Sequence, residues 1–400
     1  MLSWLAPVLV FGLVVLVHEA GHFVAAKLIG VYAPRFSIGF GRPLWRRRRG
    51  ETEYVIGWLP IGGYVRMASR EDEATAFLEG GSEMSTVPAV GASSSPTVAE
   101  GSSGVTRQRD WDPEAMVPFG PKPVPPDRWF ESKPLWARLV IMLAGVTMNV
   151  VLALLVSTGL FAVYGRPFVP AVIDSVVAGR PAEKAGLQRG DSIVTVNGKP
   201  VRRWTDVTVE INRSAGQPVE LEIVRGGRQM PITVTPEPVA DTNLVTGRPQ
   251  QVGKIGAASR VSQRERLTPV GSLVAGWNAT ASMGNTVLQV IWGLLTGQVS
   301  VTQLGGPIQI ARSSVEAARS GVAVLFQLIA FLSVNIAILN LLPIPILDGG
   351  QILLNVAEAI KGSAFSARTR EYILRAGLLA IALLFAIVMF NDIKGLVKPF

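Results

Sequence analysis

The chain has 400 residues, 48% of them hydrophobic, and a formal net charge of +9 at pH 7. This composition is too apolar for an ordinary soluble enzyme and is typical of a membrane protein. Cysteine is absent, which excludes disulfides and thiolate metal sites, so any metal must be held by nitrogen and oxygen. The basic residues cluster beside apolar segments, as in RRRR at 46–49, which favours topology signals and contact with anionic lipid over nucleic-acid binding.

Four segments stay apolar for about the 20 residues that cross a bilayer, and they lie at 4–26, 139–164, 322–346 and 373–390. The first lacks a basic start and a small-residue cleavage site, so we expect a retained helix rather than a signal peptide. A fifth apolar stretch, 271–296, is interrupted by polar residues. It is predicted to form an amphipathic helix on the membrane surface.

The segments between these spans differ in character. Residues 31–67 contain two strand-like runs joined around Pro60, which predicts a membrane-associated β-hairpin over 52–67. Residues 68–128 are rich in Ser, Gly, Pro and acidic residues without periodicity, which predicts a disordered loop. Alternating apolar runs over 169–238 predict a small α+β domain.

The positive charges set the expected orientation. The loop 31–138 is rich in Lys and Arg, and Lys361, Arg368 and Arg370 lie in 347–372, which places both loops in the cytoplasm. The small domain and both termini are then extracytoplasmic. The predicted fold class is an α-helical polytopic membrane protein with four transmembrane helices, a membrane-associated β-hairpin and one extracytoplasmic α+β domain.

The run LVVLVHEAGHFVAA at 13–26 places His18, Glu19 and His22 in an apolar helix. His18 and His22 are four residues apart, so both imidazoles project from one face and can bind one ion. In such a site the glutamate takes a proton from a water that the metal has acidified, which indicates hydrolysis. These are the only histidines of the chain, and a merely structural pair in lipid would still need polar partners.

A catalytic zinc needs a third protein ligand and an open position, and without further His or Cys this ligand must be a carboxylate. The acids near the spans are Asp348, Glu358 and Asp392. With four spans, the third delivers Asp348 to the cytoplasmic side, at the depth of the histidines, whereas Asp392 emerges at the opposite face. We therefore expect Asp348 to be the third ligand.

The segment NLLPIPILDGG at 340–350 surrounds this aspartate. Its prolines forbid a regular helix, and its glycines permit tight turns. A broken helix at membrane depth is tolerated where it lines a cavity, although a plain proline kink is the alternative. Asn149 and Asn335 are candidates for lining the same cavity or for hydrogen bonding between helices.

HEAGH at 18–22 and NLLPIPILDGG at 340–350 resemble the two defining motifs of the site-2 protease family of intramembrane zinc metalloproteases, specifically the bacterial regulator of sigma-E protease type. The similarity covers nearly the whole chain except 68–128, through GGYVRM (62–67), AGVTMN (144–149), LGGPIQIA (304–311) and FND (390–392). PAEKAGLQRGDSIVTVNG at 181–198 resembles a PDZ domain of bacterial proteases. Many relatives of this type carry two such domains in tandem, whereas this chain shows one.

The resemblance implies an enzyme of the bacterial inner membrane that cleaves single-span membrane proteins within the bilayer. Its substrates would be anti-sigma factors or remnant signal peptides already trimmed by a site-1 type protease. It implies that His18, His22 and Asp348 bind Zn²⁺ and that Glu19 activates water. The PDZ-like domain could bind a new carboxyl terminus or obstruct bulky substrates.

A substrate helix must be unwound before its carbonyls can be attacked, and an exposed strand edge can take over the freed hydrogen bonds. We expect the hairpin to do this and Asn340 to hold the substrate backbone beside the zinc. A plain turn at the interface is the alternative for Gly62, Gly63 and Tyr64. The expected substrate-binding residues are Asn340, Gly62, Gly63, Tyr64, Val65, Pro343 and Pro345.

Together these expectations divide the chain into seven parts. They are the first helix and hairpin (1–67), the cytoplasmic loop (68–128), the second helix (129–167), the PDZ-like domain (168–240), an extracytoplasmic linker with the amphipathic helix (241–320), the third span with its loop (321–372) and the fourth span with the tail (373–400). Two other functions remain open, a non-catalytic membrane PDZ scaffold and a metal transporter. The position of Glu19 beside the histidine pair counts against a transporter.

Overall fold

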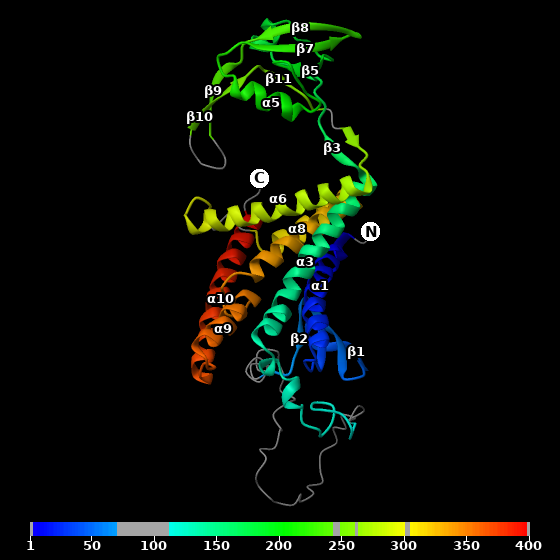
Figure 1. Ribbon diagram of the computed structural model, residues 1–400, viewed down its shortest axis with the longest axis vertical. Helices are drawn as coiled ribbons and strands as arrows, with labels where there is room; N and C mark the ends of the chain where they lie inside the picture. Colours follow the sequence, from blue (N-terminus) through cyan, green and yellow to red (C-terminus); the bar gives the residue numbers. More distant parts are fainter. Residues whose placement is uncertain (1–2, 70–111, 243–248, 261–262, 301–304, 398–400) are drawn as a thin grey trace, which may run out of the picture. The chain divides into compact units, whose positions relative to one another are not determined.

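The computed structural model describes residues 3–69, 112–242, 249–260, 263–300 and 305–397 (Figure 1). It contains two compact units, a helical unit of Met1–Leu160 and Leu273–Phe400 and a strand-rich unit of Phe161–Ser272. The helical unit is built from η1 (Ser3–Leu5), α1 (Ala6–Ile29), β1 (Arg35–Arg49), β2 (Thr52–Arg66), η2 (Pro126–Arg128), η3 (Phe130–Ser132), α3 (Leu135–Tyr164), α6 (Pro269–Leu295), α7 (Pro307–Ser320), α8 (Val322–Asn340), α9 (Asp348–Lys361) and α10 (Ala367–Val397).

Within the described residues, four helices are long and apolar enough to cross a membrane. They are Ser3–Ile29, Leu135–Tyr164, Val322–Asn340 and Arg368–Lys394. This confirms the expectation of a polytopic membrane protein with four apolar spans. The stretch 271–296 is helical, as α6, but is not among these four. Its location at a membrane surface stays a prediction.

The third span ends earlier than the hydropathy indicated. We expected 322–346, but α8 ends at Asn340 and α9 begins only at Asp348. Proline at 343 disfavours helical backbone at the residue before it, so the helix stops short of the apolar run. The break that the prolines predicted is therefore present, and Asp348 follows it directly.

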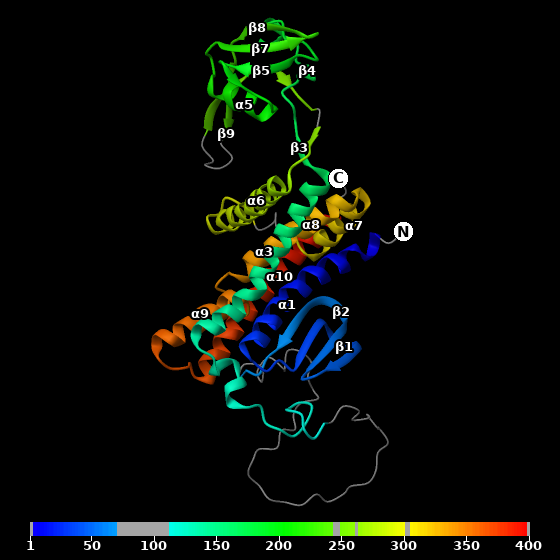
Figure 2. The same ribbon diagram turned by 45° about the vertical axis from the view of Figure 1, so that its right-hand side comes forward.

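The β-structure beside α1 differs from the predicted hairpin over 52–67 (Figure 2). Residue Phe36 of β1 pairs on one side with Tyr54 and on the other with Val65, and Tyr54 also pairs with Arg47. The two halves of β2 therefore do not pair with each other, because the first part of β1 lies between them. The hairpin prediction was wrong in its pairing, since strand order depends on residues outside the 52–67 window. Residues 62–66 form an edge of the sheet.

The predicted loop 68–128 is described only in part, because residues 70–111 lie outside the described residues. Residues 112–125 form turns, and η2 follows at Pro126–Arg128. Here the Arg48 guanidinium lies over the Phe119 ring, 4.5 Å from its centroid. This part of the predicted loop is thus anchored to β1.

The strand-rich unit has an antiparallel four-stranded sheet of order β6-β5-β7-β8. Its core is formed by alternate residues of β7, such as Leu221 and Ile223, packed with Val207 and Ile211 from α5. The unit contains β3 (Arg166–Phe168), β4 (Ser175–Val176), α4 (Pro181–Lys184), β5 (Ser192–Val196), β6 (Lys199–Pro200), α5 (Trp204–Arg213), β7 (Val219–Arg225), β8 (Arg228–Val234), β9 (Glu237–Thr242), β10 (Pro249–Lys254), β11 (Ala257–Ala258) and β12 (Gln263–Glu265).

Close packing of α1 against α3 and α8 positions the histidines. A Cβ at Gly21 of α1 would lie 2.9 Å from the Cα of Gly145 in α3, so these two helices touch through backbone. On another side, Val10 and Val14 of α1 pack against Ile329 of α8. Figures 1 and 2 both show α1 and α3 side by side. Because the helices meet this closely, side chains of α3 and α8 reach the two histidines.

Candidate metal centre and active site

Three side chains from two distant parts of the chain converge at the centre of the helical unit. The Nε2 atoms of His18 and His22 are 3.2 Å apart, and they lie 3.2 and 3.3 Å from Oδ2 of Asp348. Both histidines are buried, and the aspartate side chain is 17% exposed. The structure thus brings together all three residues that the sequence predicted as ligands.

The dimensions of this triangle fit zinc. Ligand atoms about 2.0–2.1 Å from a tetrahedral zinc are separated by about 3.3–3.4 Å, close to the three distances here. Asp348 Oδ2 is buried, and among the described residues no hydrogen bond satisfies it. Two imidazoles and one carboxylate are also a donor set that a catalytic zinc uses.

The ring of His22 is held by the backbone of α3. Its Nδ1 lies 2.8 Å from the carbonyl oxygen of Ile141, which can only accept a hydrogen bond. The proton of a neutral His22 is therefore on Nδ1, and Nε2 presents a lone pair toward Asp348 and His18. Gly145 makes this approach possible, because a Cβ there would overlap the His22 ring.

The ring of His18 lies between two asparagines. The Nδ2 atom of Asn340, at the end of α8, is 2.9 Å from His18 Nε2, and the Nδ2 atom of Asn149 in α3 is 3.5 Å from His18 Nδ1. Asn149 is completely buried and also receives the Ser333 hydroxyl on its main-chain oxygen at 2.8 Å. The predicted residue Asn340 therefore lies at the site.

Asp348 is the first residue of α9 and begins a polar stripe along that helix. Gln351, Asn355 and Glu358 follow at spacings of three or four residues, so they share a face with it. Gln351 donates to the Pro345 carbonyl at 3.2 Å, and Asn355 accepts from Arg138 of α3 at 2.7 Å. These contacts tie the first turns of α9 to the proline segment and to α3.

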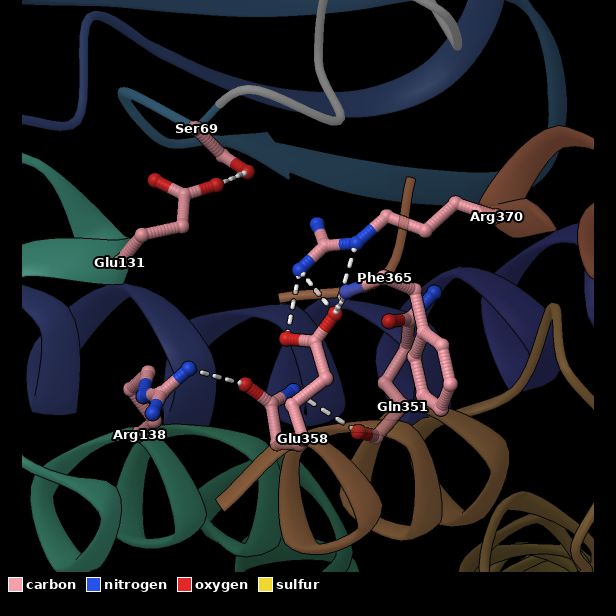
Figure 3. A network of polar contacts seen from close by, with 8 residues as sticks. Ser69, Glu131, Arg138, Gln351, Glu358, Phe365 and Arg370 are labelled. Atoms are coloured by element: carbon pink, nitrogen blue, oxygen red, sulfur yellow. Dashed lines mark hydrogen bonds and ion pairs between the residues drawn. The ribbon is translucent and has the colours of Figure 1, made fainter. Parts of the chain in front are cut away.

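The other two acidic candidates are occupied elsewhere. Glu358 is buried and accepts hydrogen bonds from Arg370 of α10, with a 2.6 Å contact to each carboxylate oxygen (Figure 3). Asp392 accepts the backbone N–H groups of Gly306 and Ile308 at the start of α7. The choice of Asp348 among the three acids thus agrees with the geometry.

Glu19 lies where α1 meets the edge of the sheet. A Cβ at Gly63 would lie 3.2 Å from Glu19 Cγ and from Val15, so this glycine lets the 62–66 backbone approach the helix. The backbone of Val65 is within hydrogen-bonding reach of the Glu19 carboxyl. The predicted residues Gly63 and Val65 are therefore next to Glu19.

The remaining predicted substrate residues are placed less centrally. Tyr64 stacks on Phe40, with centroids 6.0 Å apart, and Gly62, at φ +93°, packs its backbone against the same ring. Pro345 packs against Gly377 of α10, and Pro343 is exposed. The structure does not bring these four into contact with the histidines.

Two features of the site were not predicted from the sequence. The Ile141 carbonyl is a backbone group, so its side chain gave no signal of its contact with His22. Gly145 falls within AGVTMN, and a glycine in an apolar helix does indicate a close helix contact. The sequence could not show that this contact is with His22.

Comparison with known proteins places the chain in a family. The profile of Peptidase family M50 matches residues 6–384. The chain belongs to peptidase family M50. It is similar to the regulator of sigma-W protease RasP of Bacillus subtilis (30% identical, covering 98% of each chain) and to metalloprotease MmpA of Caulobacter vibrioides (33% identical, covering 96% of this chain and 94% of the relative).

Another relative is the zinc metalloprotease RasP of Bacillus licheniformis, 30% identical over 98% of this chain and 99% of its own length. Three findings together identify the chain as a zinc metalloprotease: it belongs to this family, it is similar to zinc metalloproteases, and it contains the cluster of two histidines and one aspartate. Because its described residues include four helices that are long and apolar enough to span a membrane, this M50 peptidase is a membrane protein.

Proposed function

We propose that this M50 peptidase cleaves transmembrane segments of single-span membrane proteins inside the bilayer. The observation that carries this proposal is the triangle of His18, His22 and Asp348 between helices apolar enough to span a membrane. A hydrolytic site enclosed by such helices suits a substrate that is itself an apolar segment. One relative is named as a regulator of sigma-W protease, which supports anti-sigma factors as a substrate class, with remnant signal peptides as a second.

His18, His22 and Asp348 would hold the zinc, and Glu19 would be the general base. Bound zinc supplies a Lewis acid that activates water and polarises the scissile carbonyl. Glu19 takes the proton from the attacking water on its carboxylate and passes it to the nitrogen of the leaving amine. Its neighbours support this role, since the 62–66 edge brings an extended backbone beside the carboxylate.

The edge at 62–66 would receive the unwound substrate as an added strand. Its Val65 and Tyr64 pair on one side with Phe36 and Ser37, and within the described part of the chain no strand pairs with the other side. Backbone groups on such an edge can bind a substrate of any sequence. We infer that the substrate strand lies along the unpaired side of this edge, beside Glu19.

Asn340 would bind the substrate backbone beside the zinc. Its Nδ2 now lies 2.9 Å from His18 Nε2, whose lone pair can accept only one donor. When that lone pair binds zinc, the Asn340 amide loses this acceptor and becomes available to a substrate carbonyl. The prolines at 343 and 345 would act indirectly, by ending α8 at this asparagine.

We place the chain in the bacterial inner membrane, with the active site towards the cytoplasm and the strand-rich unit outside it. The support is the arginine-rich segment 46–49 and the basic residues Lys361 and Arg370, since such residues favour the cytoplasmic side. We assign the strand-rich unit to a PDZ-like domain that receives substrates already shortened by a site-1 type protease. Its four-stranded sheet packed on α5 agrees with this assignment.

The test combines metal analysis with cleavage of a tagged single-span substrate in proteoliposomes. Wild type should contain one zinc per chain and cleave. Glu19→Gln should keep the zinc and lose cleavage, whereas Asp348→Ala should lose both. Equal cleavage by Glu19→Gln would overturn the enzymatic role of Glu19, and a wild type without zinc would overturn the ligand assignment.

A second experiment tests the edge. Val65→Pro removes one backbone N–H from the 62–66 segment, while the matched Val65→Ile keeps it. We expect Val65→Pro to retain zinc but to cleave at least tenfold more slowly than Val65→Ile, a loss that corresponds to about 1.4 kcal/mol. Equal rates would argue against strand addition without affecting the zinc assignment.

A further inference from the structure

One face of α3 carries the groups that contact both imidazoles. Ile141, Gly145 and Asn149 are spaced four residues apart, like the two histidines, and all three are buried. Ile141 contacts His22, and Asn149 contacts His18. Asn149 comes after Ile141 in α3 but contacts His18, which comes before His22 in α1, so the two helices run antiparallel. Each imidazole therefore contacts one polar group of α3.

The side-chain amide of Asn149 is not satisfied in its present orientation. Its Nδ2 faces His18 Nδ1 at 3.5 Å, while its Oδ1 is buried and has no hydrogen-bond partner among the described residues. An amide oxygen buried without a donor is unfavourable. Ser333 holds the main-chain oxygen of Asn149 and leaves the side-chain amide able to turn about its last bond.

Zinc binding requires the opposite orientation of this amide. A neutral His18 that gives its Nε2 lone pair to a metal carries its proton on Nδ1, and that N–H needs an acceptor. The acceptor of His22 is already present in the Ile141 carbonyl. For His18, the polar side chain that faces Nδ1 is Asn149. A 180° rotation about the last side-chain bond of Asn149 exchanges its amide oxygen and nitrogen and presents Oδ1 to His18 Nδ1.

We propose that Asn149 is a positioning residue for His18, whose Nδ1–H donates to Asn149 Oδ1 when zinc is bound. This inference rests on the proposed ligation of zinc by His18. The hydrogen bond fixes the tautomer and the rotation of the ring, so that Nε2 points toward His22 and Asp348. Asn149 does not contact zinc or substrate, and it acts only through the imidazole.

The first test measures zinc affinity in detergent by competition with a chelator, on protein purified without a polyhistidine tag. Asn149→Leu removes the acceptor at similar volume, and Asn149→Asp keeps an acceptor. The matched control is Ser333→Ala, which removes a buried hydrogen bond to the same residue without touching an imidazole. We expect zinc to bind about 10- to 100-fold more weakly to Asn149→Leu, which is the range typical for loss of a group that hydrogen-bonds a metal ligand. Asn149→Asp and Ser333→Ala should bind zinc no more than about threefold more weakly than wild type.

The second test reads the tautomer itself. Because the chain has only two histidines, ¹⁵N-histidine labelling gives one pair of ring nitrogens for each. In the zinc-loaded wild type, both Nδ1 atoms should carry hydrogen-bonded protons. In Asn149→Leu the His18 Nδ1 resonances should shift while those of His22 stay unchanged, which a general loss of packing would not produce.

The outcomes separate this inference from the proposed function. A wild type that binds no zinc overturns the ligand assignment and the inference with it. A leucine variant with wild-type zinc affinity and an unchanged His18 spectrum overturns the inference alone. Equal weakening by leucine and aspartate also overturns it, because aspartate keeps an acceptor and loss of the acceptor could then not be the cause.

Discussion

The carboxylate of Asp392, near the end of α10, accepts the backbone N–H of Gly306 at 2.9 Å and so binds the first residues of α7. A second bond from Ile308, also 2.9 Å, completes a helix cap supplied by a different helix. Gly306 has no room for a Cβ because Asp392 lies against it. The motifs LGGPIQIA and FND, far apart in the chain, thus form one contact.

Removing this cap should destabilise the helical unit. Hydrogen bonds to a charged group contribute about 1.5–3 kcal/mol, so Asp392→Leu should lower the free energy of unfolding by about that amount. Asp392→Asn, which keeps one acceptor, should lose less. Unfolding by SDS titration in mixed micelles measures the difference. The half-exposed neighbour Ile393 offers the control Ile393→Ala, and an equal loss there would refute the capping role.

The pair of Glu358 and Arg370 should contribute more than a surface ion pair. Their side chains are only 7% and 16% exposed, and Figure 3 shows the guanidinium facing the carboxylate. Loss of one partner leaves a buried charge, so Glu358→Ala should cost about 3–5 kcal/mol in the same assay. The control is Glu371→Ala, because its pair with Arg375 is exposed and should contribute no more than about 0.5 kcal/mol. Equal effects of the two variants would contradict this prediction.

The strand-rich unit should lose stability in acid through Asp191. This residue is fully buried, and although burial alone would raise its pKa, hydrogen bonds from Arg225 and the Gln188 backbone hold the pKa below its ordinary value. Because the folded pKa lies below the unfolded value of about 3.9, the stabilisation is present above about pH 4 and is lost as the pH falls through the folded pKa. Asp191→Asn should be less stable than wild type near neutral pH, and the difference should shrink in acid.

Pulsed hydrogen exchange on the intact chain measures this effect in β5 and β7. Wild type and Asp191→Asn are equilibrated in urea at about pH 6 and at about pH 3 and then labelled at one fixed pH. The matched control is Asp174→Asn, whose partner Arg189 is largely exposed. A difference between wild type and Asp191→Asn that is the same at both pH values would exclude Asp191 as the source.

Local pattern was sufficient to predict the four apolar spans and the cluster of His18, His22 and Asp348. His18 and His22 are related by helix geometry alone, and Asp348 could be chosen over Asp392 because the number of spans decides which side each loop reaches. Neither inference depends on how each helix is rotated about its own axis. The break after Asn340 was also predictable, because proline acts on its own backbone and on the residue before it.

Contacts that depend on packing could not be predicted in this way. The segment around Phe36 lies between the two halves of β2, and strand order depends on which distant segments meet. For Asn149 the sequence left two roles open, lining the cavity or hydrogen bonding to another helix. The choice between them depends on the rotation of α3 about its own axis. Asp392 was recognised as a candidate ligand, yet its partner is the backbone of a helix that begins 85 residues earlier (Pro307 to Asp392).

The close approach of α3 to His22 gives a direct test of the site. A Cβ at Gly145 would overlap Nε2 and two carbons of the His22 ring, and that ring is held by Ile141 and cannot move aside without losing its hydrogen bond. Gly159 lies on the same helix, and a Cβ there meets nothing within 4 Å.

Gly145→Ala should therefore bind zinc at least tenfold more weakly than Gly159→Ala, since displacing a ligand ring costs at least as much as losing its supporting group. Both substitutions replace glycine by alanine in a helix, so they change helix propensity equally and the comparison isolates the contact with His22. Chelator competition measures both affinities. Equal zinc affinity of the two variants would show that α3 does not approach His22 in the membrane-embedded protein.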